Sequence, residues 1–557
     1  MATDVPRSNL SELSGKLVLF QILLAPIFIT PWWNFDPINL PRLLLLASIT
    51  LPLTLIGAFN LTGNLLFTMP RAEKAFIFLL ATFLIMSTFS LFLSKANITL
   101  QLYGVQGRNT GYIAFFLFIS LIFGIYFGAP KINDKHLVLV IFFGGIVNLI
   151  YGGFQSLGVD SINWENPYGS VVGALGNPNF VSSFLGMYGT FLTSLLLWRK
   201  SNSVVIILGL FLLLVANTVV ISKTGSIQGY FVLGIGITAL LLLKIRLNIV
   251  KAFALGFTFI VAMVIGLLGV AGRGPLSEML YQNTLQVRVF FWEAAWKLIT
   301  EKPLIGYGWD TFGNWYKTAR SLESTQPYGL GLTTNSAHNL FLDVGVSGGL
   351  ICMISLIITS VLITLRGISF KFKVSDTNWK FSVSFAIWMG FLAQSLISVN
   401  SLAITIWGFS FGGLALHFTR NTIEPEYSHK KSVTRKSVSL KKAGVFFCLI
   451  LGFLITFPAL YSDHKFRVAL GESRGDLILQ AANRFPTNDF RLLVAANIFY
   501  RNNLNESARE LVRKSLLLNP RSTSALNLLL QDQELSKSEK DIIKSKIKKI
   551  DIFAKLE

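Results

Sequence analysis

The chain alternates long apolar runs with short polar segments. Runs of about 17–25 apolar residues can cross the hydrocarbon layer of a bilayer as helices, and roughly thirteen such runs occur. They begin near Lys16, Leu40, Lys74, Gly111, Lys135, Ala174, Ser203, Gly225, Ile249, Asn339, Phe381, Ser401 and Ala443. The pattern predicts an all-α fold, a polytopic transmembrane helical bundle of about 12–13 spans.

Composition supports this prediction. Of the 557 residues, 52% are hydrophobic and only 14% are charged, and a soluble domain of this length would carry more charge. No small-residue cleavage site follows the first apolar run, residues 16–30, so this run is interpreted as a retained span. The two cysteines, Cys352 and Cys448, both lie in apolar runs, which argues against a disulfide framework and a cysteine zinc site.

The formal net charge of +21 is best explained as an orientation signal. No long basic face with interleaved aromatic residues occurs, so no nucleic-acid partner is expected. Lys and Arg accumulate in alternate loops, as the positive-inside rule describes for cytoplasmic loops. With the N-terminus inside, these loops are 71–74, 131–135, 199–200, 244–251, 366–380 and 420–442. This orientation puts Arg108, Lys223, residues 272–338 and the C-terminal tail outside.

The domain pattern changes near residue 461. Residues 1–461 are expected to form the membrane domain, including a large outer loop at 271–338, and residues 462–557 a soluble helical module. In this module Pro486 and Pro520 lie 34 positions apart, and each follows a helix-like run. That spacing is the tetratricopeptide period. With only about two units, a plain helical hairpin is the alternative.

The outer loop begins with a helical pattern that includes Arg288. The apolar positions of this pattern are Val289, Trp292, Ala295, Trp296 and Ile299. Their spacing predicts an amphipathic or interfacial helix. Pro303 should end it, and Gly306 and Gly308 permit a tight turn close to other backbone.

His338 and Arg288 are the candidate reactive residues of the loop. An imidazole at the start of a span can take a proton from a sugar hydroxyl, although a helix cap or a membrane anchor is the alternative role. The planar guanidinium of Arg288 suits a diphosphate, although a snorkelling arginine at the membrane surface is equally consistent with its position.

Three further outer segments carry polar candidates. Arg108, in "GVQGRNTGY", can bind an anion together with helix-start amides or can face lipid headgroups. Asn177 and Asn179, in "GNPNF", mark a helix start at which Asn179 is the expected cap. Lys223, in "SKTGS", either adds positive charge to an anion site or marks the membrane edge.

Metal and nucleotide chemistry are not expected. The acidic residues of the outer loops are scattered, and they form neither a compact pair nor an HExxH motif. The chain also lacks a P-loop glycine–lysine motif. We therefore expect no metal and no cofactor.

Several of these segments together carry a family resemblance. They are "GRNTGY", "GNPNFVSSFL", "SKTGS", "RVFFWEAAWKLITEKPLIGYGWDTF" and "AHNLFLDVGVSGGL". Over roughly residues 16–416 the chain resembles the O-antigen ligase/polymerase superfamily of bacterial membrane glycosyltransferases, which includes protein O-oligosaccharyltransferases. The resemblance implies a location in the bacterial inner membrane. It also implies metal-independent, inverting transfer of a glycan from an undecaprenyl diphosphate carrier, on the periplasmic side, to a glycan, lipid A–core or protein acceptor.

The resemblance also implies roles for individual residues. His338 would be the catalytic base, Arg288 and Arg108 would bind the diphosphate, and Asn339, Asn177 and Asn179 would support the site. The family often has arginine in the short "SKTGS" turn, so Lys223 would act there only as a point charge. Many members of the family lack a C-terminal module of this kind, and the module could hold an acceptor, a chain-length partner or another enzyme of the pathway. A transporter or flippase for a lipid-linked sugar, and a non-catalytic scaffold bearing tetratricopeptide repeats, are the alternatives.

Overall fold

The computed structural model describes most of the chain and shows helices as its regular structure. The described residues are 5–61, 69–162, 166–198, 203–245, 257, 261, 265, 273–275, 283–374, 376–420 and 435–554, and they contain no strand. The span expected near Ile249 lies largely outside them, as do Gly272, Glu278 and residues 421–434 of the basic loop.

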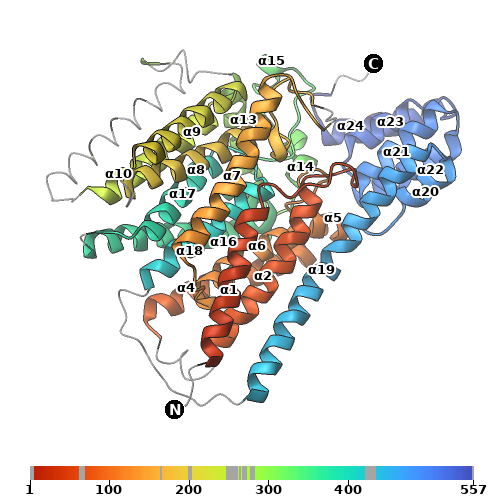
Figure 1. Ribbon diagram of the computed structural model, residues 1–557. Coiled ribbons are helices and arrows are strands. Elements are labelled where there is room, and N and C mark those ends of the chain that lie inside the picture. The colour runs from red at the N-terminus through yellow and green to blue at the C-terminus, as the bar shows by residue number, and fades with distance from the viewer. Residues whose placement is uncertain are drawn as a thin grey trace. The chain divides into compact units, whose positions relative to one another are not determined.

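Twelve of the thirteen expected spans coincide with helices, which carry the labels of Figure 1. They are α1 (Val5–Leu24), α2 (Asn39–Leu61), α4 (Arg71–Leu93), α6 (Tyr112–Gly128), α7 (Asp134–Ser156), α8 (Pro178–Trp198), α9 (Val204–Lys223), α10 (Gln228–Lys244), α16 (Leu340–Lys373), α17 (Trp379–Ser395), α18 (Leu402–Arg420) and α19 (Arg435–Glu472). Helix α1 begins at Val5, well before the expected start at Lys16, because the polar residues preceding the apolar run continue the same helix.

Among the described residues, eight helices are long and apolar enough to cross a membrane. These are α2, α4, α7, α8, α9, α16, α18 and the part of α19 from Ser439. Helices α6 and α10 are apolar but have only 17 residues each. The prediction of an all-helical polytopic membrane fold is therefore confirmed.

The chain divides into two compact units. The first contains residues 1–85, 107–245 and 355–464, and the second contains residues 86–106, 246–354 and 465–557. Helices α4, α16 and α19 each contribute one part to each unit. The C-terminal residues 465–557 share their unit with much of the expected outer loop.

Small residues allow close helix packing in the first unit. Helix α2 packs against α6, and α10 packs against α8 and α17. A Cβ atom at Gly124 of α6 would lie 2.8 Å from the backbone of Leu53 in α2, and one at Gly186 of α8 would lie 2.5 Å from the carbonyl oxygen of Gly229 in α10. Such close backbone approach is typical of helix interfaces in membranes.

In the second unit, α16 is interrupted at Gly349. This residue has φ 82° and ψ 176°, so the helical hydrogen-bond ladder is broken there. A loop after α13 (Asn283–Glu301) bonds to the backbone around the break. The amide of Leu350 donates to the carbonyl of Pro303 at 2.6 Å, and the amide of Tyr307 donates to the carbonyl of Val346 at 2.8 Å. The loop thus satisfies backbone groups that the broken helix leaves available.

Gly306, in this loop, provides a test of the fold. Its φ is +72°, and a Cβ atom there would lie 2.5 Å from the backbone oxygens of Val346 and Ser347. We expect Gly306→Ala to destabilise the protein by roughly 1–3 kcal/mol, because it adds both backbone strain and a clash. Thermal unfolding of the detergent-solubilised protein measures the change. Gly331→Ala is the control, since a Cβ atom at Gly331 meets no atom within 4 Å. Equal unfolding temperatures for the two variants would contradict the expectation.

The C-terminal part of the second unit is a set of helices with a regular spacing. They are α20 (Gly475–Ala482), α21 (Asp489–Arg501), α22 (Asn505–Leu518), α23 (Thr523–Leu530) and α24 (Lys537–Ile550). Each of these helices packs against the next one along the chain (Figure 1). The N-caps Asn488 of α21 and Ser522 of α23 occupy positions 34 apart, which is the spacing of the two prolines.

Candidate functional site

His338 lies immediately before the first turn of α16. Its backbone has φ +56°, a left-handed conformation that is uncommon for a residue other than glycine. The cap of the helix is the next residue, Asn339, whose side-chain oxygen accepts hydrogen bonds from the amides of Phe341 at 3.0 Å and Leu342 at 3.1 Å. His338 therefore does not cap α16, because Asn339 does.

Asp343 ties the chain before His338 to the helix. This buried carboxylate accepts a hydrogen bond from the hydroxyl of Ser336 at 2.6 Å and another from the amide of Ala337 at 2.7 Å. The hydroxyl oxygen of Ser336 in turn accepts from the amide of His338 at 3.0 Å. In the sequence, Asp343 is one of the scattered acidic residues of the outer loops. An acid in the first turn, four residues after a cap asparagine, was the signal that could have identified this role.

A hydrogen bond of the His338 ring indicates which of its two nitrogens carries the proton in the neutral form. Its Nδ1 atom lies 3.1 Å from the carbonyl oxygen of Ser336. A carbonyl oxygen only accepts hydrogen bonds, so this contact assigns the proton to Nδ1. In the neutral ring, Nε2 then carries the lone pair. The ring packs on Phe291, with 5.2 Å between the ring centroids.

Arg288 lies on the buried face of α13. Its side chain is only 7% exposed, and it is followed on that face by Phe291, Ala295 and Leu298. Burial lowers the pKa of Arg288 to about 10, which leaves the guanidinium cationic at neutral pH. Arg288 and Phe291 are three residues apart, so their side chains are neighbours on the helix surface. Phe291 therefore adjoins both Arg288 and the ring of His338.

The helix expected around Arg288 is confirmed, and its apolar positions divide between a buried face and an exposed one. Val289 is 49% exposed and Trp296 is 52% exposed, whereas Phe291 and Ala294 are buried. Helix α13 ends at Glu301, two residues before Pro303, as expected.

The same unit joins this site to the C-terminal helices through α14 (Phe312–Ala319). The ring of Tyr316 in α14 contacts Phe291, with 5.3 Å between centroids. After α14, the buried guanidinium of Arg320 donates to both carboxylate oxygens of Asp551, at 2.8 and 2.9 Å. Within α14, the Trp315 ring lies 3.8 Å from the guanidinium of Arg521. None of these contacts was predicted from the sequence.

The other predicted site residues belong to the first unit. Asn177, not Asn179, caps α8, because its side-chain oxygen accepts from the amide of Asn179 at 2.9 Å. The side chain of Asn179 instead accepts from the hydroxyl of Ser226 at 2.7 Å. The structure thus brings together the "GNPNF" segment and the turn after Lys223. The side chain of Lys223 itself is exposed at the end of α9.

The loop with Arg108 also belongs to the first unit, where Asn39 bonds to it. The side chain of Asn39 donates to the carbonyl of Gly107 at 2.6 Å. Next to Asn39, the carboxylate of Asp36 accepts hydrogen bonds from the amides of Ile38 at 3.2 Å and of Asn39 at 3.0 Å. Asp36 itself is buried, and its own amide donates to the carboxylate of Asp463 at 2.9 Å. Sequence analysis did not single out Asp36.

Asp36 should make stability depend on pH. Burial, and then the charge of Asp463, raise the pKa of Asp36 to about 6. A carboxyl with a raised pKa stabilises the folded state fully below its unfolded pKa, near 4, and this contribution is lost as pH rises through about 6. We expect Asp36→Asn to flatten the stability profile by about 2 kcal/mol between pH 4.5 and 7.5.

Thermal unfolding of the solubilised protein across this pH range measures the effect. Asp541→Asn is the control, because Asp541 is exposed on α24. If Asp36→Asn shifted stability by the same amount at every pH, the carboxyl would not titrate as described.

Within the described residues, no three His, Cys, Asp or Glu side chains gather as they would to hold a metal ion. Metal independence of the reaction stays a prediction from sequence and resemblance.

The apolar helices define this chain as a multi-helical membrane protein, with a candidate site on the α13 and α16 segments of its second unit. Residues 210–357 match the O-antigen ligase family, which associates the chain with membrane glycosyltransferases. The matched residues include Lys223, Arg288, His338 and Asn339, whereas Arg108 lies outside them. A comparison with curated proteins gives no match.

Proposed function

We propose that the protein is a membrane glycosyltransferase that moves a glycan from an undecaprenyl diphosphate carrier to an acceptor hydroxyl. We place it in the bacterial inner membrane, with the site on the periplasmic side. The family match supports the reaction class, and the distribution of Lys and Arg among the loops supports the orientation. The acceptor is a sugar hydroxyl on a glycan or on lipid A–core, or a hydroxyl on a protein.

In the proposed reaction His338 is the general base. Its Nε2 atom accepts the proton of the acceptor hydroxyl while the hydroxyl oxygen attacks the anomeric carbon of the donor sugar. The bond between that carbon and the diphosphate oxygen breaks, and its electron pair leaves with the carrier diphosphate. A single displacement of this kind inverts the anomeric centre. The Nδ1 contact with Ser336 carries this proposal, because it leaves the Nε2 lone pair as the basic site of the ring.

Arg288 binds the diphosphate in this proposal. The leaving group gains negative charge as the glycosidic bond breaks, and a fixed cation beside it stabilises the transition state. The placement of Phe291 next to both side chains supports a shared task for Arg288 and His338. For Arg108 and Lys223, a part in diphosphate binding stays a prediction from the family resemblance.

The C-terminal helices are proposed to be two tetratricopeptide-like units. The first would consist of α21 and α22, and the second of α23 and α24. The 34-residue recurrence of the helix caps Asn488 and Ser522 supports this assignment.

Transfer by the purified protein in detergent tests the function. The reaction contains the carrier-linked glycan of the host and candidate acceptors, and mass spectrometry measures the product. We expect glycan on the acceptor and free carrier diphosphate. A transporter would give no product in detergent, because transport requires two compartments and transfer does not. Deletion of the gene then identifies the acceptor: unpolymerised repeats indicate a polymerase, full chains left on the carrier a ligase, and unmodified protein an oligosaccharyltransferase.

A further inference from the structure

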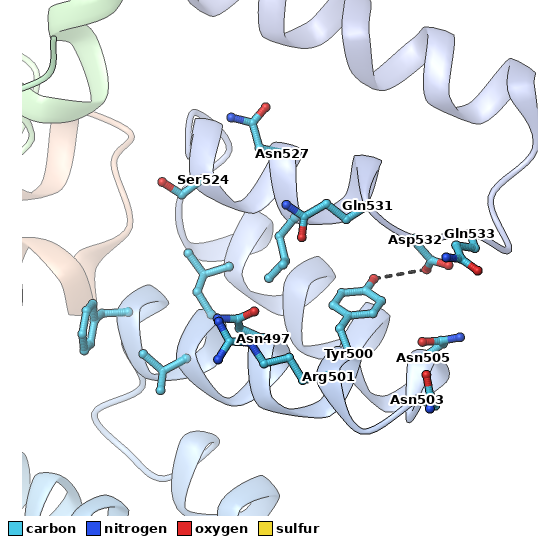
Figure 2. Close-up of a pocket in the computed structure, with 14 residues that line it drawn as sticks. Asn497, Tyr500, Arg501, Asn503, Asn505, Ser524, Asn527, Gln531, Asp532 and Gln533 are labelled. Atoms are coloured by element: carbon cyan, nitrogen blue, oxygen red, sulfur yellow. Dashed lines mark hydrogen bonds between the residues drawn. The ribbon is translucent and has the colours of Figure 1, made fainter. Parts of the chain in front are cut away.

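A groove crosses the C-terminal helices of the second unit. It has a volume of about 840 Å³ and is lined mainly by one face of α21 and one face of α23. Figure 2 shows Asn497, Asn527 and Gln531 around the same space between these helices. A concave site of this size accommodates several ring-sized groups.

The lining positions of the two helices are related by the 34-residue spacing. Phe490 corresponds to Ser524, Leu493 to Asn527, Val494 to Leu528 and Asn497 to Gln531, and all eight residues line the groove. Two successive helical hairpins therefore present equivalent positions to one continuous surface. A ligand that follows this surface must be extended, because it has to contact both α21 and α23.

The polar side chains of the groove are mostly uncharged amides. Asn497, Asn527 and Gln531 are exposed and make no side-chain hydrogen bond to the described residues. An amide both donates and accepts, which matches neighbouring sugar hydroxyls. The exposed ring of Phe490, on the same face of α21, offers an apolar surface for the C–H groups of a sugar ring.

The charged groups of the groove are few. Asp532 is buried, and its carboxylate accepts hydrogen bonds from Tyr500 at 3.1 Å and from Arg509 at 2.9 Å, so it is already neutralised. Arg501 is the cation of the lining. This balance fits a largely uncharged ligand better than one with many phosphate or carboxylate groups.

The groove also has a fixed position relative to His338. The Arg320–Asp551 ion pair and the stacking of Arg521 on Trp315 attach the C-terminal helices to α14. Tyr316 of α14 contacts Phe291, which in turn contacts His338. A module that only recruits another protein needs no such attachment, whereas the chain being elongated or transferred must be aligned with the reacting group.

We propose that this groove binds an extended, largely uncharged glycan chain, as part of the substrate or product of the transfer. The choice of a glycan over an extended peptide rests on the proposed function. The contacts themselves come from the amides on α21 and α23. Binding at this second position would keep a growing chain near the site between successive transfers.

Binding can be measured without the transfer reaction. The probe is a fluorescently labelled oligosaccharide released by mild acid from the carrier-linked glycan of the host, added to the full chain in detergent. We expect saturable anisotropy changes, and affinity reduced by roughly tenfold in the double variant Asn497→Ala/Gln531→Ala. Both side chains are exposed, so folding should be retained. Gln480→Ala, an exposed amide outside the groove, is the control and should bind as the wild type does.

Each outcome decides the proposal. Equal affinity of the wild type and the double variant would overturn it. If a labelled pool of random peptides bound more weakly to the double variant than to the wild type, while the glycan bound both equally, the groove would be assigned to a protein segment instead. Glycan binding that depends on these amides, without transfer in the purified system, would contradict the proposed function and leave the groove assignment standing.

Discussion

Replacing His338 with alanine is expected to reduce glycan transfer by roughly 10²–10⁴-fold while the protein still inserts and folds. The change removes the only proposed proton acceptor for the attacking hydroxyl. The cap of α16 should persist, since Asn339 provides it. Initial rates with saturating donor measure the loss, and the elution profile and unfolding temperature of the solubilised protein measure folding.

The control for this variant is His136→Ala, which removes an exposed histidine at the start of α7. It should transfer glycan at the wild-type rate. A pH profile separates a base from a purely structural group: the wild-type rate should rise with pH as the imidazole loses its proton, and the residual rate of His338→Ala should lack that step. Wild-type activity in His338→Ala would remove this histidine from the mechanism.

Local features of the fold were predictable because they depend on nearby residues. The apolar runs gave the positions of the helices, and Pro303 gave the end of α13. Gly306 and Gly308 both adopt positive φ, and the amide of Gly308 donates to the carbonyl of Ser347 in α16 at 3.1 Å, as expected of a tight turn close to other backbone. Each of these features is determined within about one or two helical turns of the chain.

The face of α13 was less predictable. Its apolar spacing predicted an amphipathic or interfacial helix but not which residues pack against protein, and the structure buries Arg288 and Phe291 while it exposes Val289 and Trp296. A helix beside a membrane can expose apolar residues to lipid, so hydrophobicity alone does not identify the face that packs against protein.

Contacts between distant parts of the sequence could not be predicted from local pattern. Asp551 pairs with Arg320 across 231 positions, and Asp463 accepts a hydrogen bond from the amide of Asp36 across 427 positions. Nothing near Asp36 or Asp551 in the sequence indicates such a partner. The groove of the C-terminal helices required the same kind of information, because the sequence predicted its repeat period but not which faces remain exposed.

Replacing Arg288 should have the second largest effect on transfer, and the effect should appear in the use of the donor. We expect Arg288→Ala to lower kcat/KM for the carrier-linked glycan by roughly 100-fold, because charge-assisted hydrogen bonds to the diphosphate are lost. Arg288→Lys should recover only part of this loss, because an ammonium is a point charge without the planar fork of a guanidinium. Lys297→Ala removes an exposed cation from the same helix and should leave kcat/KM unchanged.

Inhibition by inorganic pyrophosphate distinguishes diphosphate binding from a structural role of this buried arginine. In the wild type, pyrophosphate should compete with the donor, and the inhibition should weaken in Arg288→Lys and more strongly in Arg288→Ala. A loss of stability alone would reduce the amount of active protein without changing the inhibition constant. If Arg288→Ala lost activity but was inhibited by pyrophosphate as strongly as the wild type, Arg288 would support the packing of α13 against Phe291 and His338 and would not bind the diphosphate. The transition-state charge would then have to be stabilised by another cation, for which Arg108 is the first residue to test.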